Sequence, residues 1–423
     1  MIRFYNGKVL TMTNGMDISE CEVWTDGDKI SYVGAKPAEM PKFEREVDLH
    51  GNLLMPGFKD AHAHSAMTFV RSYADDLPLQ KWLFDKIYPL EARLSGEAVY
   101  AFTRLAVLEY LTSGITATYD SYFYNFSNAD AIIDTGYRTV MCGAIGKYDA
   151  NIEKMEDEYV RINKLSPRVG FRLGFHAEYT ADDRVIDFVR TMSEKYKAPL
   201  SAHSSETALE VAECIERHGL TPTRYFEEQG LLEYGGTFFH CVYMTDEDIE
   251  VFKKRGLWVV TNPGSNCKLA SGIAPIVKMI DRGLNLSIGT DGPASNNALD
   301  MFREMYLTTA LQKIAEKDAA ACDANDVLKM ALVGGGKAMG LDDCDAIAVG
   351  KQADMIVIDL FRPNMQPIHN ITKNIVYSGS KENVKLTMVA GRILYENGEF
   401  FVGDSVERIY AEADREARKI ING

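Results

Sequence analysis

Cysteine is scarce in this sequence, and its spacing is irregular. Seven cysteines are spread over 423 residues, and no two form a Cys-x-x-Cys pair. The spacing therefore excludes a zinc ribbon and a thioredoxin-like redox pair. A disulfide framework is not expected either, because a chain of this length can bury a core of its own.

Long apolar runs and an excess of basic residues are also missing. No stretch approaches the roughly 20 apolar residues of a membrane span, and the start, "MIRFYNGKVLTM", lacks the features of a signal peptide. Lys and Arg number 46 against 61 Asp and Glu, a net charge of −15, whereas nucleic-acid binding requires a basic face. We therefore expect a cytoplasmic protein whose partner is a small molecule, not nucleic acid or a membrane.

The chain length and the pattern of its two ends predict two domains. Short β-type runs separated by turn residues occupy the first ~50 residues and recur near the C-terminus in "ADMIVIDL" and "VKLTMVAGRILYENGEF". We expect the two ends, residues 1–54 and 346–423, to form one small sheet domain together. The middle, residues 55–345, forms the larger domain.

The middle of the chain alternates apolar strand-like runs with helical stretches. In residues 95–114, apolar side chains fall on one helical face, Ser95 can cap the start, and Gly114 stops the end. The eight strand-like runs are "NLLMPGFKDAHAH", "ITATYD", "RTVMCGAI", "RVGFRLGFHA", "PLSAHS", "GTFFHC", "LWVVTN" and "NLSIGTD". Eight strand–helix repeats favour a closed (β/α)8 TIM barrel over an open sheet.

Polar and ionisable residues recur where these strands end. They are His62, His64, His176, His203, His240, Asn262 and Asp291. The carboxyl ends of all strands in such a barrel open onto one face, so these side chains are expected to converge there.

The pair His62 and His64 presents two imidazoles to one side of a strand, because alternate residues point the same way. By itself this pattern fits either a packed pair or a metal site. With His203 and Asp291 it becomes three nitrogens and one oxygen, a set suited to one divalent ion, Zn²⁺ first and Fe²⁺ second. Water on such an ion is deprotonated near neutral pH and becomes a nucleophile.

Glu206 follows His203 by three residues in "HSSE" and has two interpretations. A carboxylate there can stand above the metal and carry a proton to the substrate. Alternatively, serines and a glutamate before an apolar run are typical of a helix start, and Glu206 would then only cap a helix.

At this point the chain resembles the amidohydrolase superfamily. Within it, the chain is similar to the branch of 5-methylthioadenosine/S-adenosylhomocysteine deaminases and triazine hydrolases. The motifs that carry the resemblance are "MPGFKDAHAHSAM", "ADDLPLQKWLFDKIYPLE", "HAEYTADD", "AHSSET", "HCVYMTDEDI", "NPGSNCKLASGIAPI", "IGTDGPASNNALDMF" and "ADMIVIDL".

The resemblance implies a role for each residue of the site. One metal ion is held by His62, His64, His203 and Asp291, because no lysine closes a mid-barrel strand to bridge a second ion. Glu206 is the proton shuttle, Asp291 the base for the attacking water, and His240 the group that polarises this water or the developing oxyanion. His176 and Ser295 contact the substrate, and the terminal β segments form a small β-sandwich.

For substrate recognition, the resemblance points to "QKWLFDKIYPLE". Trp82 packs against the base or the 5′ group of a nucleoside, and Glu91 holds the ribose hydroxyls. Without the resemblance, the same stretch is an amphipathic helix with Trp82 in the core and Glu91 in solvent.

Three departures from the branch pattern concern specificity. Glu178 replaces the usual proline beside His176, and Ser65 replaces a bulky apolar residue after His64. Members that accept homocysteine grip its carboxylate with arginines, and here only Arg138 stands in the corresponding stretch. Uncharged 5′-modified adenosines are therefore favoured over S-adenosylhomocysteine.

Together these observations predict a zinc-dependent deaminase of an adenine-type nucleoside, which releases ammonia through attack by metal-bound hydroxide. The alternative is an aminohydrolase or dechlorinase of another heterocycle, such as a triazine, a pterin or a free purine. A non-catalytic scaffold is disfavoured because all four ligands are present. We expect a homo-oligomer, a dimer or a tetramer.

Overall fold

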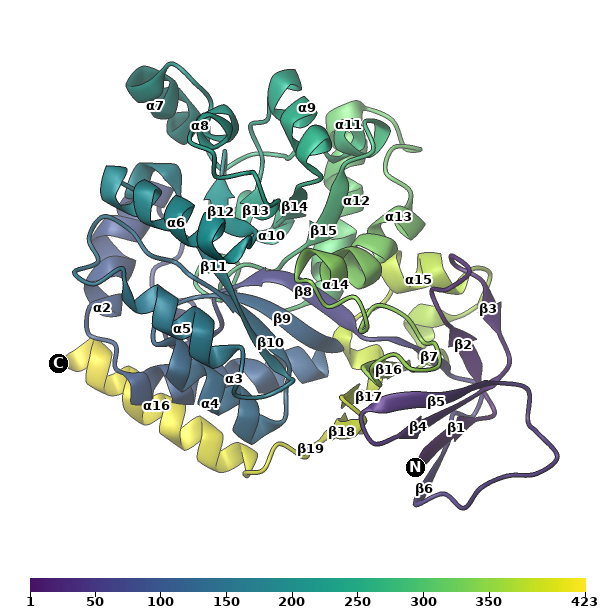
Figure 1. Cartoon of the computed structure of the whole chain (residues 1–423). Coiled ribbons are helices and arrows are strands. Elements are labelled where there is room, and N and C mark those ends of the chain that lie inside the picture. Colours follow the sequence, from purple (N-terminus) through teal and green to yellow (C-terminus); the bar gives the residue numbers. More distant parts are fainter.

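A computed structural model describes all residues, 1–423, and contains the predicted barrel (Figure 1). Eight parallel strands follow one another in order, and a parallel bridge between Ala63 and Asp291 joins the last to the first. The strands are β8 (Phe58–Ala63), β9 (Ile115–Ser121), β10 (Thr139–Cys142), β11 (Val169–Gly174), β12 (Leu200–Ser204), β13 (Gly236–His240), β14 (Trp258–Thr261) and β15 (Asn285–Ile288). The (β/α)8 prediction is confirmed.

Two further sheets are built from the ends of the chain, and the larger one combines both ends. One has the order β5-β4-β1-β6 and the other β19-β18-β17-β16-β7-β2-β3, so β16 from the C-terminal segment pairs with β7 from the N-terminal one. Their strands are β1 (Ile2–Tyr5), β2 (Lys8–Leu10), β3 (Ile18–Ser19), β4 (Glu22–Asp26), β5 (Lys29–Gly34), β6 (Arg45–Asp48), β7 (Leu53–Pro56), β16 (Met355–Ile358), β17 (Val384–Val389), β18 (Arg392–Glu396) and β19 (Glu399–Phe400). A buried apolar cluster that includes Phe4, Val23 and Met388 contains residues from both sheets, as a sandwich requires.

The first predicted strand is divided in the structure. It breaks at Gly57 into β7 of the sandwich and β8 of the barrel. A side chain at Gly57 would meet Cγ2 of Thr116 at 2.1 Å, so only glycine fits at this crossing. The exact domain boundaries stay a prediction, and we propose Gly57 as the first of them.

Helices surround the barrel (Figure 1). They are α1 (Leu79–Trp82), α2 (Tyr88–Glu91), α3 (Gly96–Thr112), α4 (Asn125–Thr135), α5 (Lys154–Ile162), α6 (Asp183–Tyr196), α7 (Ala208–His218), α8 (Pro222–Glu228), α9 (Asp246–Arg255), α10 (Pro263–Lys268), α11 (Ile276–Asp281), α12 (Met301–Glu316), α13 (Ala324–Lys329), α14 (Gly335–Ala338), α15 (Ile371–Tyr377) and α16 (Val406–Asn422). Ser95 caps α3 by accepting a hydrogen bond from the amide of Ala98, as predicted. None of the helices combines the length and apolarity needed to cross a bilayer.

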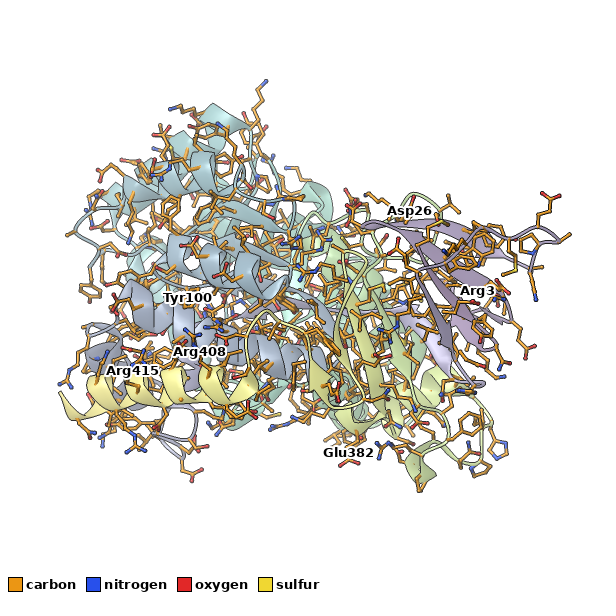
Figure 2. All side chains as sticks on the ribbon, turned by 90° about the horizontal axis from the view of Figure 1, so that it is seen from below. Arg3, Asp26, Tyr100, Glu382, Arg408 and Arg415 are labelled. Atoms are coloured by element: carbon orange, nitrogen blue, oxygen red, sulfur yellow. The ribbon has the colours of Figure 1, made fainter.

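The C-terminal helix α16 was not expected from the β pattern of that end of the chain. It lies along the barrel side of the molecule, and Tyr100 of α3 lies near Arg408 of α16 (Figure 2). Buried Arg104 of α3 pairs with Asp404 at 2.6 Å and with Glu412 at 2.9 Å. These ion pairs and an apolar stripe on α16 hold the end of the chain against the barrel.

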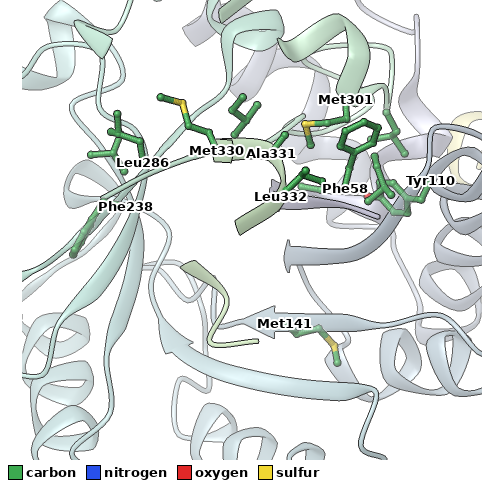
Figure 3. Close-up of a cluster of buried hydrophobic side chains, with 14 of the residues drawn as sticks. Phe58, Tyr110, Met141, Phe238, Leu286, Met301, Met330, Ala331 and Leu332 are labelled. Carbon is green, nitrogen blue, oxygen red and sulfur yellow. The ribbon is translucent and has the colours of Figure 1, made fainter. Parts of the chain in front are cut away.

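The main core lies between the barrel strands and their helices. Phe58, Tyr110, Met301 and Leu332 belong to it (Figure 3). A smaller apolar cluster with Ala61, Tyr119 and Phe239 contains residues of several barrel strands. The interior of the barrel is therefore filled with side chains below its open end, and this packing supports the polar residues at the strand ends.

Candidate active site

The two imidazoles of β8 lie where that strand ends in the barrel. His62 is fully buried, and neither of its ring nitrogens makes a hydrogen bond within the protein. Its ring stacks on Phe239 with the centroids 3.8 Å apart, which fixes its orientation. A buried imidazole without partners calls for a ligand that the protein itself does not provide.

His62 is part of a five-residue cluster that could hold a metal ion. The possible ligand atoms of His62, His203 and His240 lie within 4.8 Å of one another, as do those of His62, His64 and Asp291. Oδ1 of Asp291 is 3.4 Å from Nε2 of His62 and 3.1 Å from Nε2 of His64. The structure therefore brings all four predicted metal ligands together, and it places His240 beside them.

Three of the imidazoles are oriented by oxygen atoms behind them. In each, Nδ1 lies against an acceptor, so that Nε2 is left to face the cluster. The acceptors are the carbonyl of Ser121 for His64, the carbonyl of His176 for His203 at 2.7 Å, and Oδ1 of Asn266 for His240 at 2.8 Å. Such acceptors fix the tautomer of metal-binding histidines, so the donor set fits a divalent ion.

Most of the cluster has the electrostatics of a ligand set. His64 is the exception: burial lowers its pKa, but Asp291 outweighs burial and raises it to about 9, so a metal ion has to displace a proton from this ring. Burial lowers the pKa of His62 to about 3 and that of His203 well below its ordinary value, which keeps both rings neutral. Burial opposes the charge on Asp291, but the neighbouring imidazoles outweigh it and hold the pKa of this carboxyl well below its ordinary value. Neutral imidazoles and an ionised carboxylate are the forms that bind metal.

Backbone strain is concentrated at the same place. His240 has φ +72° and Asp291 has φ +61°, in the left-handed region that non-glycine residues rarely adopt. Strain of this kind persists where the surrounding structure imposes it and is frequent at functional sites.

Glu206 lies beside the cluster and is not a helix cap. The capping box of α7 is formed by Thr207 and Glu210, and Glu210 also accepts hydrogen bonds from the amides of Ser205 and Glu206. Oε1 of Glu206 accepts a hydrogen bond of 3.1 Å from Ser271, and its Oε2 is 3.9 Å from Nε2 of His240. The capping interpretation of Glu206 is therefore wrong, and its carboxylate is available to a ligand.

A pocket of about 940 Å³ opens next to these residues. The predicted site residues on its wall are His64, His176, His203, Glu206, His240, Asp291, Ser295, Trp82 and Glu91. His62 is the one predicted residue that does not reach the wall, because it lies buried behind the others. This volume lies in the range of small-molecule sites.

Trp82 and Glu91 do not belong to a plain amphipathic helix. A π-helical turn, Leu83–Ile87, separates α1 from α2, and both side chains line the pocket. Tyr122 donates a hydrogen bond of 2.7 Å to Oε1 of Glu91, and burial raises the pKa of this carboxyl. Glu91 is thus held in the pocket wall and not in solvent.

His176 and Ser295 are both anchored to neighbouring side chains. Nδ1 of His176 lies 2.9 Å from Oγ1 of Thr180, and burial lowers the pKa of this imidazole to about 4. The hydroxyl of Ser295 donates a hydrogen bond of 2.8 Å to Oδ2 of Asp291. Ser295 therefore orients Asp291 as well as lining the pocket.

Two of the departures from the branch pattern, Glu178 and Ser65, do not line the pocket, whereas Gly146, where a second arginine might be expected, does. Glu178 pairs with Arg217 of α7 and with His218 at 3.0 Å. The amide of Ser65 donates to Asp120 at 2.8 Å, and its hydroxyl lies 2.9 Å from that of Tyr110.

Arg138 is buried outside the pocket as well. Its guanidinium pairs with Asp354 at 2.7 Å and donates to Gln352 at 2.9 Å. Arg138 therefore cannot receive a substrate carboxylate.

Sequence reasoning missed several supporting residues. Asn266 and Ser271 lie in the quoted "NPGSNCKLASG" stretch, yet nothing in their spacing links them to His240 and Glu206. Tyr122 follows directly after β9, and its position after a strand end is the signal that could have found it.

Comparison with known proteins agrees with this site. Residues 53–394 match the amidohydrolase family. The chain is 37% identical to a 5-methylthioadenosine/S-adenosylhomocysteine deaminase of Caldanaerobacter subterraneus, over 99% of this chain and 98% of that protein. It is 40% identical to a 5′-deoxyadenosine deaminase of Methanothermobacter thermautotrophicus, over 84% of this chain and 85% of that protein.

Among solved structures, the chain is similar to an adenosine deaminase from Xanthomonas campestris with bound zinc. The TM-score is 0.94 at 30% identity, over 100% of this chain and 99% of that chain. The site combines imidazoles with a carboxylate at the open end of a barrel, and the similarities extend over most or all of the chain. This chain belongs to the amidohydrolase family.

Proposed function

We propose that this protein is a zinc-dependent deaminase of an adenine-type nucleoside, either adenosine or a 5′-modified adenosine. Water replaces the amino group at C6 of the base, and ammonia leaves. The observation that carries the proposal is that one pocket holds the metal-ligand cluster, the free carboxylate of Glu206 and the anchored carboxylate of Glu91. The names of the full-length relatives support the same substrate class.

We assign the metal to His62, His64, His203 and Asp291. When bound, a divalent ion supplies the Lewis acidity that makes water a nucleophile at neutral pH. Three nitrogens and one oxygen suit zinc, with iron as the second choice. The similar adenosine deaminase structure contains zinc.

Proton transfer falls to the two carboxylates beside the cluster. Asp291 accepts the proton of the attacking water, and Ser295 holds its Oδ2 in place for this step. Glu206 delivers a proton to N1 of the purine while C6 is attacked, and it regains a proton from the new hydroxyl at C6 as the 6-oxo product forms. The hydrogen bond from Ser271 to its Oε1 leaves Oε2 to face the substrate. The proton from Asp291 then leaves with the amino group as ammonia.

His240 and His176 complete the reacting end of the pocket. The bond between Nδ1 of His240 and Asn266 directs Nε2 into the pocket, where it polarises the attacking water or the oxygen that gains negative charge. His176 stays neutral and contacts the base.

The ribose of the nucleoside binds at Glu91, away from Asp291 and Glu206. Glu91 accepts hydrogen bonds from the ribose hydroxyls, while the hydroxyl of Tyr122 holds the carboxylate. Trp82 packs against the 5′ side of the nucleoside. A free base or a triazine has no ribose hydroxyls to donate to Glu91. Glu91 therefore discriminates between the two predicted substrate classes.

The test is ammonia release by zinc-loaded protein from adenosine, 5′-deoxyadenosine, 5-methylthioadenosine, adenine, guanine and an aminotriazine. We expect the nucleosides to be the best substrates by kcat/KM. We also expect Glu91→Ala to raise KM for nucleosides more than for adenine. Preferred turnover of a free base or a triazine would overturn the proposal. The predicted homo-oligomer is tested separately by the molar mass in solution.

A further inference from the structure

One part of the pocket carries a carboxylate that the proposed reaction does not use. We call it the carboxylate arm, and it is lined by Tyr124, Asn125, Tyr148, Asp149, Lys154 and Glu158. These residues follow β9 and β10 or belong to α5, on the same side of the barrel as α2 (Figure 1). Tyr124 and Asn125 follow closely after Tyr122, which holds Glu91, so the arm adjoins the proposed ribose site.

Glu158 is the central residue of the arm. It is 7% exposed, and it forms no ion pair with any lysine or arginine. Nδ2 of Asn125 donates to its Oε2 at 3.1 Å, whereas its Oε1 has no hydrogen-bond partner although the residue lines the pocket. Burial raises the pKa of this carboxyl by more than the hydrogen bond from Asn125 and the charge of Lys154 lower it. A buried carboxylate of this kind requires a donor or a cation, which a ligand can supply.

The arm offers nothing to an anionic ligand. Lys154 is the one lysine or arginine on the wall of the pocket, and its Nζ already lies 4.0 Å from Oδ1 of Asp149. Asp157 adds a further carboxylate to the wall, and Arg161 pairs with it at 2.8 Å. A ligand carboxylate placed here would be repelled.

An aromatic ring faces the same space. Tyr124 is 46% exposed, yet its position is fixed because its hydroxyl donates to the carbonyl of Leu94 at 2.8 Å. Its backbone adopts φ +53°, a conformation that tyrosine rarely adopts. A fixed ring and a buried carboxylate on the wall of one pocket suit an ammonium group, through cation–π attraction and a charge-assisted hydrogen bond.

We propose that the carboxylate arm binds a positively charged group on the 5′ substituent of the nucleoside, with Glu158 as its partner. This inference rests on the proposed function and names the substrate class more closely. The preferred substrate is a 5′-modified adenosine that carries an amine and no carboxylate. Glu158 is then the residue that determines specificity at the 5′ position.

Three analogues of equal length test the proposal. They are 5′-deoxyadenosines with a 3-aminopropylthio, a butylthio or a 3-carboxypropylthio group at the 5′ position. We expect kcat/KM of the wild-type protein to be about tenfold or more higher for the amine than for the neutral analogue, with the carboxylate lowest. A carboxylate that equals or exceeds the amine would overturn the inference.

The variant Glu158→Gln should abolish the preference for the amine. Its kcat/KM for the neutral analogue should stay within about threefold of the wild-type value. Glu153→Gln is the matched control, because it removes the same charge from an exposed position at the start of α5 and should keep the preference. If Glu158→Gln lowers kcat/KM for all three substrates alike, the residue has a structural role and the inference fails. The ranking with wild type stands as a test even if the variant does not fold.

Binding separates this inference from the proposed function. Calorimetric titration of the three analogues, without turnover, should give the same ranking of Kd. If no nucleoside is deaminated but the amine still binds most tightly, the proposed function fails and the arm is retained. If the neutral analogue is deaminated and the amine neither binds nor reacts better, the arm assignment alone is wrong.

Discussion

The hydroxyl of Tyr122 donates a hydrogen bond of 2.7 Å to Oε1 of Glu91, so a strand end and a helix end of the barrel mouth meet at one carboxylate. The variant Tyr122→Phe removes this donor and leaves a buried carboxylate with less support. We expect KM for nucleosides to rise by about fivefold to tenfold, in line with the loss of one hydrogen bond, with kcat little changed. Steady-state ammonia release measures both constants.

Tyr225→Phe is the control for this change, because Tyr225 stacks on His218 and does not line the pocket. A Tyr122→Phe protein that loses kcat and keeps KM would contradict the placement of the ribose at Glu91.

Glu206→Gln should abolish catalysis without loss of metal. The amide keeps the shape of the side chain but cannot deliver a proton to the purine, so we expect kcat to fall by about 10²–10⁴. Metal content measured by mass spectrometry should stay at the wild-type value. Turnover close to normal would remove Glu206 from the role of proton shuttle.

Removal of the metal should affect stability as well as activity. The nitrogens of His62 are buried without partners, so an ion that binds them stabilises the folded state by about 4 kcal/mol when its concentration is 1,000 times Kd. We expect chelator-treated protein to melt several degrees lower, and zinc to restore both the melting temperature and ammonia release.

The variant His203→Asn should melt at the temperature of chelator-treated wild-type protein, and added zinc should not raise this temperature. Identical melting of treated and untreated wild-type protein, with metal content verified, would contradict the assignment of the cluster as a metal site.

We expect the stability of the protein to depend on pH through Glu304, a buried residue outside the metal-ligand cluster. It accepts hydrogen bonds from the amide of Gly264 at 2.8 Å and from Asn296 at 2.9 Å, and burial raises its pKa to about 8. The unfolded chain loses this proton near pH 4.5, so the contribution of Glu304 to stability is complete below that pH. It is lost progressively as the pH rises toward 8.

Glu304→Gln stays uncharged over the whole range. The free energy of unfolding of the wild type, measured against this variant by urea denaturation, should therefore fall between pH 5.5 and 8. Parallel pH profiles would show that Glu304 is ionised in the folded protein.

The barrel could be predicted from the sequence, and so could the clustering of the four residues proposed as metal ligands, because both leave local signals. Strand ends such as His62-Ala63-His64 combine apolar runs with polar residues, and the closed barrel brings them together. The capping box could have been assigned from the sequence, because Thr207 and Glu210 have the spacing of a capping box, whereas the residue three positions before Glu206 is His203. The contacts of Glu206 with Ser271 and His240 could not be predicted from local sequence.

The supporting contacts depend on distant segments and left no signal. Ser271 meets Glu206, and Asn266 meets His240, across different strand–helix units. The helix α16 did leave a signal, because Ser405 suits a helix cap and Ile409, Ala413 and Ile420 recur at helical spacing; the interpretation of this end of the chain as β overlooked it.

The pairing of Ala63 with Asp291 has a consequence for the order of folding. His62 and His64 are synthesised long before Asp291, and the carboxylate reaches them only when the last strand docks against the first. Contacts so far apart in the chain form late and slowly. Metal uptake with full affinity must therefore wait for the ring of strands to close, so zinc binding during refolding would report on the completion of the barrel.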